Sequence, residues 1–242
     1  MHIELSMIRR YSINNVMFNP ILKNLKETFS QISSGLKADQ ELVQISKRRG
    51  GVGIDISNLR PKGVSTKNAA RTTDGIGVFM ERFSNTCREV AQGGRRGALM
   101  ITISIAHCEI ETFINIKRDL KKVTGANVSI RLSDEFMQAV ADNKTYTHRW
   151  PINSATPEVT KEINARDLWQ TVITSAHNTA EPGLIFWDRQ HKYSTSSVYP
   201  GYENVSTNPC SEIAMQGGDS CRLIAINLYN FVEEPFTKQA RF

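Results

Sequence analysis

The possible folds of this chain are limited most strongly by an alternation of short apolar runs with segments of helical periodicity. The clearest run, residues 98–105, is nearly continuous and rich in β-branched residues, which is typical of a strand buried on both faces. The repeated alternation predicts an α/β fold with a mainly parallel sheet and helices outside it. We expect helices at 21–47, 75–91, 107–120, 133–140 and 163–179, strands at 52–56, 98–105, 127–132 and 184–187, and loops at 141–160 and 188–220.

Composition narrows the class of protein. The 242 residues carry 30 Lys and Arg against 24 Asp and Glu, a net charge of +6, which suits anionic small ligands such as nucleotides and does not require nucleic acid. The chain has no apolar run of the roughly 20 residues that span a bilayer, and its start lacks the apolar core of a signal peptide. With 4 cysteines, it is no disulfide framework, so we expect a reducing, cytoplasmic setting and no membrane partner.

Asn208, Cys210 and Glu212 place an amide and a carboxylate two residues to either side of a thiol, in a turn-rich segment. In an extended segment these three side chains would share one face. Like charges disfavour ionisation, so a carboxylate here works against a thiolate nucleophile, and a neutral thiol beside a proton acceptor suits hydrogen-atom chemistry. The alternative is an inert, buried cysteine beside a capping glutamate.

Two glycine-rich segments could bring backbone close to an anionic ligand. Gly51 and Gly53 follow the basic residues 47–49, and residues 92–97 combine an amide, two arginines and three glycines. Neither segment matches a Walker loop or a dinucleotide fingerprint. A tight turn for the first and a solvated loop for the second remain the alternatives.

The other cysteines and the histidines give weaker signals. Cys221 lies eleven positions after Cys210, a spacing that fits neither C-x-x-C nor a zinc knuckle, and its default role is a core residue before a strand. Cys87 and Cys108 fall in helical patterns and are expected to pack there. The five histidines do not cluster with carboxylates, so we expect no structural metal.

Taken together and in order, several segments resemble the catalytic subunit of ribonucleotide reductases, and their wording is closest to the adenosylcobalamin-dependent type. The resemblance covers nearly all of the chain from about residue 40 onward. The segments are GGVGIDISNLRPKG, FMERFSNTCREVAQGGRRGALMITI, KRDLKKVTGANVSIRLSDEFM, AEPGLIFWD, STNPCSEI and DSCRLIAINLYNFVEEPFT.

The resemblance implies a fold. Family members form a ten-stranded α/β barrel from two five-stranded parallel halves, with a finger loop through the centre. Residues 1–242 would then be a single partial domain that comprises the first half-barrel, with the finger loop at about 204–220. Half a closed barrel exposes sheet edges, so we expect the isolated chain to self-associate.

The resemblance also implies roles, those of a ribonucleoside-diphosphate reductase that acts on the ribose 2′-hydroxyl with a disulfide as acceptor. Cys210 would become a thiyl radical and abstract the ribose 3′ hydrogen, Glu212 would take the 3′-hydroxyl proton, and Asn208 would hydrogen-bond both. Cys221 would be one member of the redox pair. The positions implied for substrate or effector binding are Gly51, Gly53, Arg60, Gln92, Gly93, Gly94 and Arg96.

The chain departs from the family pattern in three ways. Val16 stands at the best-matching position for the first redox cysteine, and Lys23 stands where the pattern has an effector-binding Asp. The chain is also much shorter than family catalytic subunits.

Two hypotheses follow. One is a split or partial reductase that needs a complementing fragment, and the other is an inactive nucleotide-binding or assembly module. For the full enzyme the resemblance implies adenosylcobalamin, or else a radical-generating small subunit. It also implies a ribonucleotide substrate, a deoxynucleotide or ATP effector, a thioredoxin- or glutaredoxin-type reductant and a dimer.

Overall fold

The computed structural model describes residues 15–17, 31–66, 71–90, 94, 97–221 and 224–242. Its centre is a five-stranded sheet in the order β1-β2-β3-β4-β7, and every neighbouring pair is parallel. The predicted α/β class with a parallel sheet is therefore confirmed. The strands are β1 (Asn15–Met17), β2 (Gly51–Asp55), β3 (Leu99–Ser104), β4 (Asn127–Leu132) and β7 (Gly183–Phe186).

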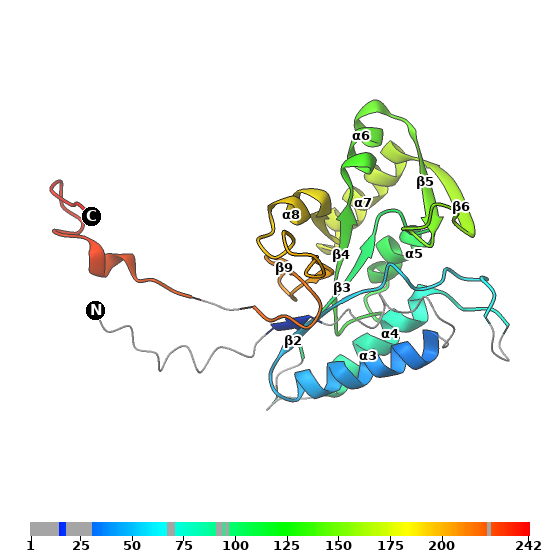
Figure 1. Cartoon of the computed structure of the whole chain (residues 1–242), viewed down its shortest axis with the longest axis horizontal. Coiled ribbons are helices and arrows are strands. Elements are labelled where there is room, and N and C mark those ends of the chain that lie inside the picture. The colour runs from blue at the N-terminus through cyan, green and yellow to red at the C-terminus, as the bar shows by residue number, and fades with distance from the viewer. Residues whose placement is uncertain (1–14, 18–30, 67–70, 91–93, 95–96, 222–223) are drawn as a thin grey trace.

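The strand order never reverses, so right-handed crossovers bring the connecting helices to one face of the sheet. Figure 1 shows α3 and α4 below the strands and the small hairpin that carries β9 above them. No closed barrel forms among the described strands, and the half-barrel stays a prediction. The helices on the core side are α3 (Gln31–Ser46), α4 (Ile76–Glu89), α5 (Ile110–Asn115), which continues as η1 (Ile116–Arg118), and α7 (Ala165–Thr179).

The two faces of the sheet differ in polarity. Successive side chains of a strand point to opposite faces, and one set in β2, β3 and β4 is aliphatic and joins the core with the helices. The other set is polar or small, apart from the buried Met100. The expectation that 98–105 is buried on both faces is confirmed, but the second face of β3 presents Thr102, which is fully buried, and Ser104. The aliphatic set is Val52, Ile54, Leu99, Ile101, Ile103, Val128, Ile130 and Leu132.

A short antiparallel hairpin covers the polar face. It consists of β8 (Ser206–Thr207) and β9 (Ala214–Met215), and β8 contacts both β2 and β3. A Cβ atom at Gly53 would overlap the carbonyl oxygen of Thr207, so only glycine lets the hairpin come this close. The Thr102 and Ser206 hydroxyls lie 3.1 Å apart and form a hydrogen bond between sheet and hairpin.

Side chains cap the N-termini of three helices. Ser133 accepts a hydrogen bond from the Phe136 amide at 3.1 Å and begins α6 (Asp134–Asp142), which confirms the predicted cap. Asn164 caps α7 in the same way. The N-terminus of α4 is capped from a distance, because the Glu109 carboxylate accepts a hydrogen bond from the Ile76 amide at 3.0 Å.

Several expectations are wrong. Segment 141–160 is a loop only in part: residues 151–158 connect β5 (Thr145–Trp150) and β6 (Val159–Asn164), which form an antiparallel hairpin. The buried Tyr146, His148 and Trp150 alternate with more exposed residues in β5. Helix α7 accordingly begins at 165 rather than 163. Segment 188–220 contains most of α8 (Trp187–Tyr193) and the β8–β9 hairpin.

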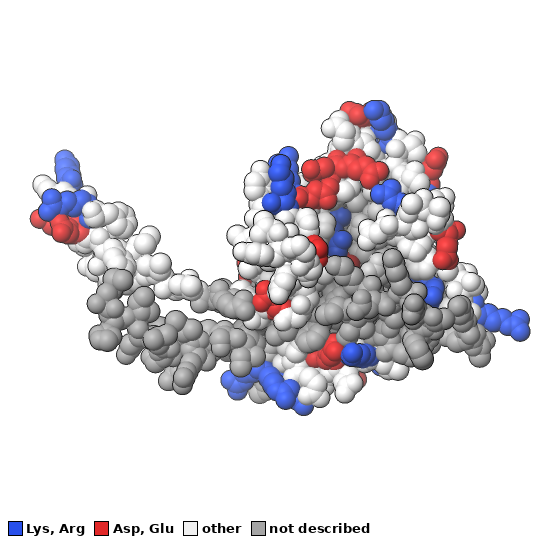
Figure 2. Space-filling view, viewed as in Figure 1, with Lys and Arg blue, Asp and Glu red and all other residues white. Residues whose placement is uncertain are grey.

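The ends of the chain also differ from expectation. The predicted helix at 21–47 is described only as α3, because residues 18–30 lie outside the described part. Residues 224–242 extend away from the body and contain η2 (Leu228–Phe231), not a strand (Figure 1, Figure 2). In the part of the chain that the structure describes, no helix has the length and apolar character to traverse a lipid bilayer.

His107 forms two hydrogen bonds inside the core. The ring is fully buried, its Nδ1 accepts a hydrogen bond from the Glu109 amide at 3.1 Å, and its Nε2 therefore donates to the Leu59 carbonyl at 2.9 Å. Burial lowers the pKa of His107 to about 4, and the nearby His148 acts in the same direction. The neutral ring is thus part of the folded state.

We predict that the chain loses stability on acidification from pH 6.5 to pH 4. In this window His107 binds a proton in the unfolded chain but stays neutral in the folded chain. The free energy of unfolding therefore falls as the pH falls, and this residue contributes about 3 kcal/mol to the loss. Urea unfolding across the window measures the slope. His107→Gln should flatten it, whereas His177→Gln, on the exposed side of α7, should leave it unchanged; an equal slope in both variants would contradict the assignment.

We also predict that Gly53→Ala displaces the hairpin. The added methyl overlaps the Thr207 carbonyl, and such overpacking costs about 1–3 kcal/mol, which lowers Tm by roughly 2–12 °C in a chain of this size. The matched control is Gly77→Ala in the first turn of α4, where an added Cβ meets nothing within 4 Å and alanine favours the helix. Thermal unfolding of both variants tests this, and a Gly53→Ala chain as stable as the parent would disprove the close approach.

Candidate functional site

Cys210 lies at the tip of the β8–β9 hairpin. Residues 208–213 form the turn, which is closed by hydrogen bonds from the Asn208 amide to the Ile213 carbonyl (3.3 Å) and from the Ser211 amide to the Asn208 carbonyl (3.0 Å). Ser211 adopts a left-handed conformation with φ of 66°. The expectation of an extended segment, in which the three side chains alternate to one face, is therefore wrong, because these residues lie in a turn.

The turn nevertheless brings the amide and the carboxylate together. Asn208 is fully buried, and its Nδ2 donates to Glu212 Oε1 at 2.5 Å while its Oδ1 accepts from the Ile213 amide at 3.4 Å. Cys210 and Glu212 are exposed. The buried amide thus orients an accessible carboxylate in the same turn as an accessible thiol, and the expectation of a buried cysteine at position 210 is wrong.

A buried ion pair anchors the base of this hairpin. Asp55 in β2 lies 3.1 Å from Arg131 in β4, and it accepts hydrogen bonds from Ser57 (2.8 Å) and Thr102 (3.1 Å). Burial raises the pKa of Asp55, and the Arg131 charge and the two hydroxyls oppose that rise. Because Arg131 also donates to the Val205 carbonyl at 3.0 Å, the pair links the sheet directly to the chain that enters β8.

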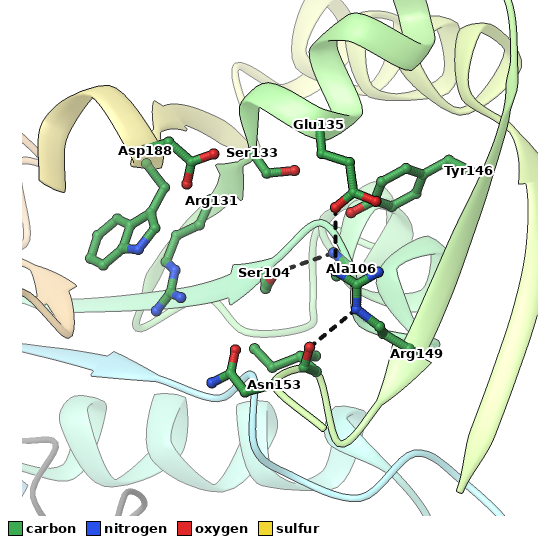
Figure 3. Close-up of a pocket in the computed structure, with 11 residues that line it drawn as sticks. Ser104, Ala106, Arg131, Ser133, Glu135, Tyr146, Arg149, Asn153 and Asp188 are labelled. Carbon is green, nitrogen blue, oxygen red and sulfur yellow. Dashed lines mark hydrogen bonds and ion pairs between the residues drawn. The ribbon is translucent and has the colours of Figure 1, made fainter. Parts of the chain in front are cut away.

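Arg131 also borders a cavity of about 370 Å³ at the carboxyl ends of β3 and β4 (Figure 3). Its guanidinium lies over the Trp187 ring, 4.0 Å from the centroid. On the other side of the cavity, Arg149 forms an ion pair with Glu135 at 3.2 Å. Asp188 accepts a hydrogen bond from the Asp134 amide at the start of α6.

These cavity residues were not among those predicted from the sequence, although one signal could have indicated them. Ligand crevices in open α/β sheets lie outside the carboxyl ends of the strands, which is where Ser133 and Asp188 follow β4 and β7. Opposite charges are already paired within the cavity, so its walls do not require an anion to balance them.

The remaining predicted residues lie apart from Cys210 in the contacts that the structure records. Gly51 and Gly53 are buried in β2 and not in a turn around an anion, and Gly53 allows the close approach of the hairpin. Arg60 lies 5.9 Å from the centroid of the Trp150 ring. Gly94 has a φ of 83°. Gln92, Gly93, Arg96 and Lys23 lie outside the described residues.

Cys221 is buried with Met215, which follows the turn, and Val16 pairs with Val52 in the register of β1 and β2. Cys87 is buried in α4 as expected, and burial raises its pKa to about 11. Cys108 does not lie in a helix: it is half-buried in the turn before α5, with its Sγ 3.6 Å from the Val159 carbonyl. Within the described ranges, no three His, Cys, Asp or Glu residues are grouped to hold a metal ion.

Comparison with known proteins gives one consistent result. The chain is 36% identical over 190 residues to a vitamin B12-dependent ribonucleoside-diphosphate reductase of Thermoplasma acidophilum, a match that covers 78% of this chain and 24% of that protein. It is 28% identical over 212 residues to the protein of the same name from Mycobacterium tuberculosis strain H37Rv, covering 86% and 28%. A ribonucleoside-diphosphate reductase large subunit of Arabidopsis thaliana matches at 26%, covering 81% and 27%.

The chain therefore spans about a quarter of the length of these relatives. A family model described as the barrel domain of ribonucleotide reductase matches residues 21–242, nearly the whole chain. The chain belongs to the ribonucleotide reductase barrel-domain family.

Proposed function

We propose that this chain supplies the radical-bearing loop of a ribonucleotide reductase, with Cys210 as the thiyl residue. The observation that carries the proposal is the buried Asn208 amide, which holds the Glu212 carboxylate in a turn whose tip exposes Cys210. A hydrogen-atom donor and a proton acceptor are needed together for reduction at a ribose, and this turn offers both within three residues.

The chemistry divides between these side chains. Loss of a hydrogen atom from the Cys210 thiol leaves a thiyl radical, which abstracts the ribose 3′ hydrogen, and Glu212 accepts the 3′-hydroxyl proton as a general base. The 2′-hydroxyl then leaves as water. The two electrons for its replacement by hydrogen come from a pair of thiols that closes to a disulfide, of which Cys221 supplies one. Val16 stands in this chain at the position proposed for the other, so the second thiol has to come from elsewhere.

The names of the relatives favour adenosylcobalamin as the radical source of the full enzyme, with a radical-generating small subunit as the other candidate. The cavity beside Arg131, about 370 Å³, is too small to hold a corrin ring. We therefore assign no residue of this chain to cobalamin and derive no step through it.

The same proposal defines partners. A ribonucleotide is the substrate, a complementing reductase polypeptide supplies the remaining barrel, and a thioredoxin- or glutaredoxin-type protein restores the dithiol. An effector nucleotide and a dimer belong to the full enzyme, with Arg60 and the 92–97 loop as the proposed effector contacts.

A second candidate function has a specific observation in its favour. Val16 and Lys23 replace a thiol and a carboxylate at the positions proposed for reduction and for effector binding. An inactive nucleotide-binding or assembly module would tolerate both replacements, whereas an unaided reductase would not.

We predict that Cys210→Ala abolishes deoxynucleotide formation by this chain combined with a complementing reductase polypeptide, assayed with and without adenosylcobalamin. The variant lacks the sulfur that carries the unpaired electron, so turnover should fall by at least the roughly 10³-fold typical of a lost covalent or radical catalyst. Cys87→Ala, which removes a buried helix thiol, is the matched control and should keep its turnover. Equal activity of Cys210→Ala and the parent would refute the thiyl assignment, and no activity in any form would favour the assembly module.

A further inference from the structure

We infer that β4 is the element that positions Cys210, with Asn127 as the principal positioning residue; the inference rests on the proposed function of that thiol. Asn127, Ser129 and Arg131 alternate along β4 and face the hairpin. Each of the three side chains contacts a different part of the hairpin or of the chain entering it.

Two of these contacts flank the cysteine. Asn127 Nδ2 donates to the Pro209 carbonyl at 3.0 Å, and the Ser129 hydroxyl lies 3.3 Å from the Ser211 hydroxyl. The residues immediately before and after Cys210 are thereby tied to one strand of the sheet. The Pro209 carbonyl belongs to the peptide bond that joins Pro209 to Cys210, so Asn127 restrains the backbone of the cysteine directly.

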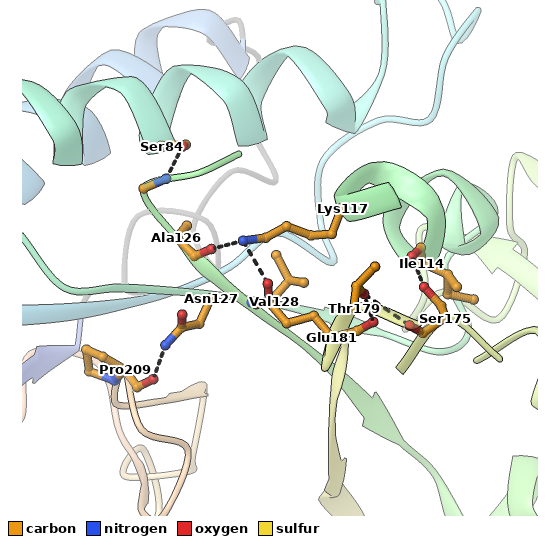
Figure 4. Close-up of polar contacts among 11 residues, drawn as sticks. Ser84, Ile114, Lys117, Ala126, Asn127, Val128, Ser175, Thr179, Glu181 and Pro209 are labelled. Carbon is orange, nitrogen blue, oxygen red and sulfur yellow. Dashed lines mark hydrogen bonds and ion pairs between the residues drawn. The ribbon is translucent and has the colours of Figure 1, made fainter. Parts of the chain in front are cut away.

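The strand that holds these contacts is itself clamped at its start (Figure 4). Glu181 accepts a hydrogen bond from the Val128 amide at 2.9 Å, and Lys117 forms an ion pair with Glu181 at 2.8 Å. Lys117 also donates to the Ala126 carbonyl at 2.6 Å. A cation from η1 and a carboxylate from the segment before β7 therefore fix the two residues that flank Asn127.

A glycine leaves room for the contact between the Ser129 and Ser211 hydroxyls. A Cβ atom at Gly183 in β7 would come within 2.6 Å of the Ser129 hydroxyl, so a larger residue there would push the hydroxyl from its place. Hydrogen-atom transfer requires that the reacting atoms are held close to their productive geometry. Contacts from a rigid strand position a turn more accurately than contacts within the turn alone. The hydroxyl and the amide thus restrain a loop whose tip is exposed.

Hydrogen–deuterium exchange on the full chain tests the positioning without any turnover. In Asn127→Ala the amides of 205–216 should exchange about fivefold faster, the change expected for the loss of one side-chain hydrogen bond, and in Asn127→Ala combined with Ser129→Ala about twentyfold faster. Asn127→Asp keeps the size but removes the donor and should match Asn127→Ala. Asn178→Ala, an exposed amide on α7, is the matched control and should leave the segment unchanged.

Exchange within twofold of the parent in both Asn127→Asp and the double variant would overturn the inference. Asn127 is exposed, so the single variants test it even if the double variant does not fold. In the complemented reductase, Asn127→Ala should lower kcat about tenfold with KM for the nucleotide unchanged, and Asn127→Gln, which keeps the amide, should restore part of kcat. If exchange responds and Cys210→Ala stays fully active, the proposed function fails while the positioning stands; if Cys210→Ala is inactive and exchange does not respond, the positioning fails alone.

Discussion

The structure depends on a close contact between a hairpin and the polar face of a parallel sheet. A hairpin can lie directly on a sheet only where the sheet offers small side chains and hydrogen-bond partners, and Gly53, Thr102 and Ser129 meet that requirement. Asp55 and Arg131 complete it with a charge pair that is almost fully shielded from water. Removal of either charge would leave the other buried without its partner, which is strongly destabilising, so this pair fixes the place of the hairpin base.

On the proposed role of Cys210, this arrangement meets two separate requirements of a radical site. The sulfur has to be accessible to a substrate, and its backbone has to be held rigidly. The turn satisfies the first because Cys210 is at the tip, and the sheet satisfies the second through contacts from β2, β3 and β4 to the residues around it. Asn208 belongs to both sets, since its buried amide closes the turn and orients Glu212.

The sequence predicted the parallel sheet and its main helices because apolar periodicity reports burial against a single core. The strands within 141–160 were not predicted. Tyr146, His148 and Trp150 alternate there, but their rings carry polar atoms and the partner strand contains charged residues, so the apolar alternation is weak. The trio of 208, 210 and 212 was found from residue types alone. Its geometry was not, because a left-handed residue at Ser211 turns the chain and no propensity of serine signals that conformation. Arg131 and Asn127 could not be found, since their partners are more than 70 residues away.

The contacts that support Cys210 and the position proposed for the second redox thiol lie on different strands. The contacts that hold the turn come from β2, β3 and β4, whereas Val16, at the proposed position of the missing redox thiol, lies in β1 at the end of the sheet. A change of the side chain at position 16 therefore leaves the hydrogen bonds around Cys210 in place. On the proposed role of Cys210, the turn can keep its geometry whether or not position 16 carries a thiol, because the hydrogen bonds recorded around the turn come from β4 and from the turn itself.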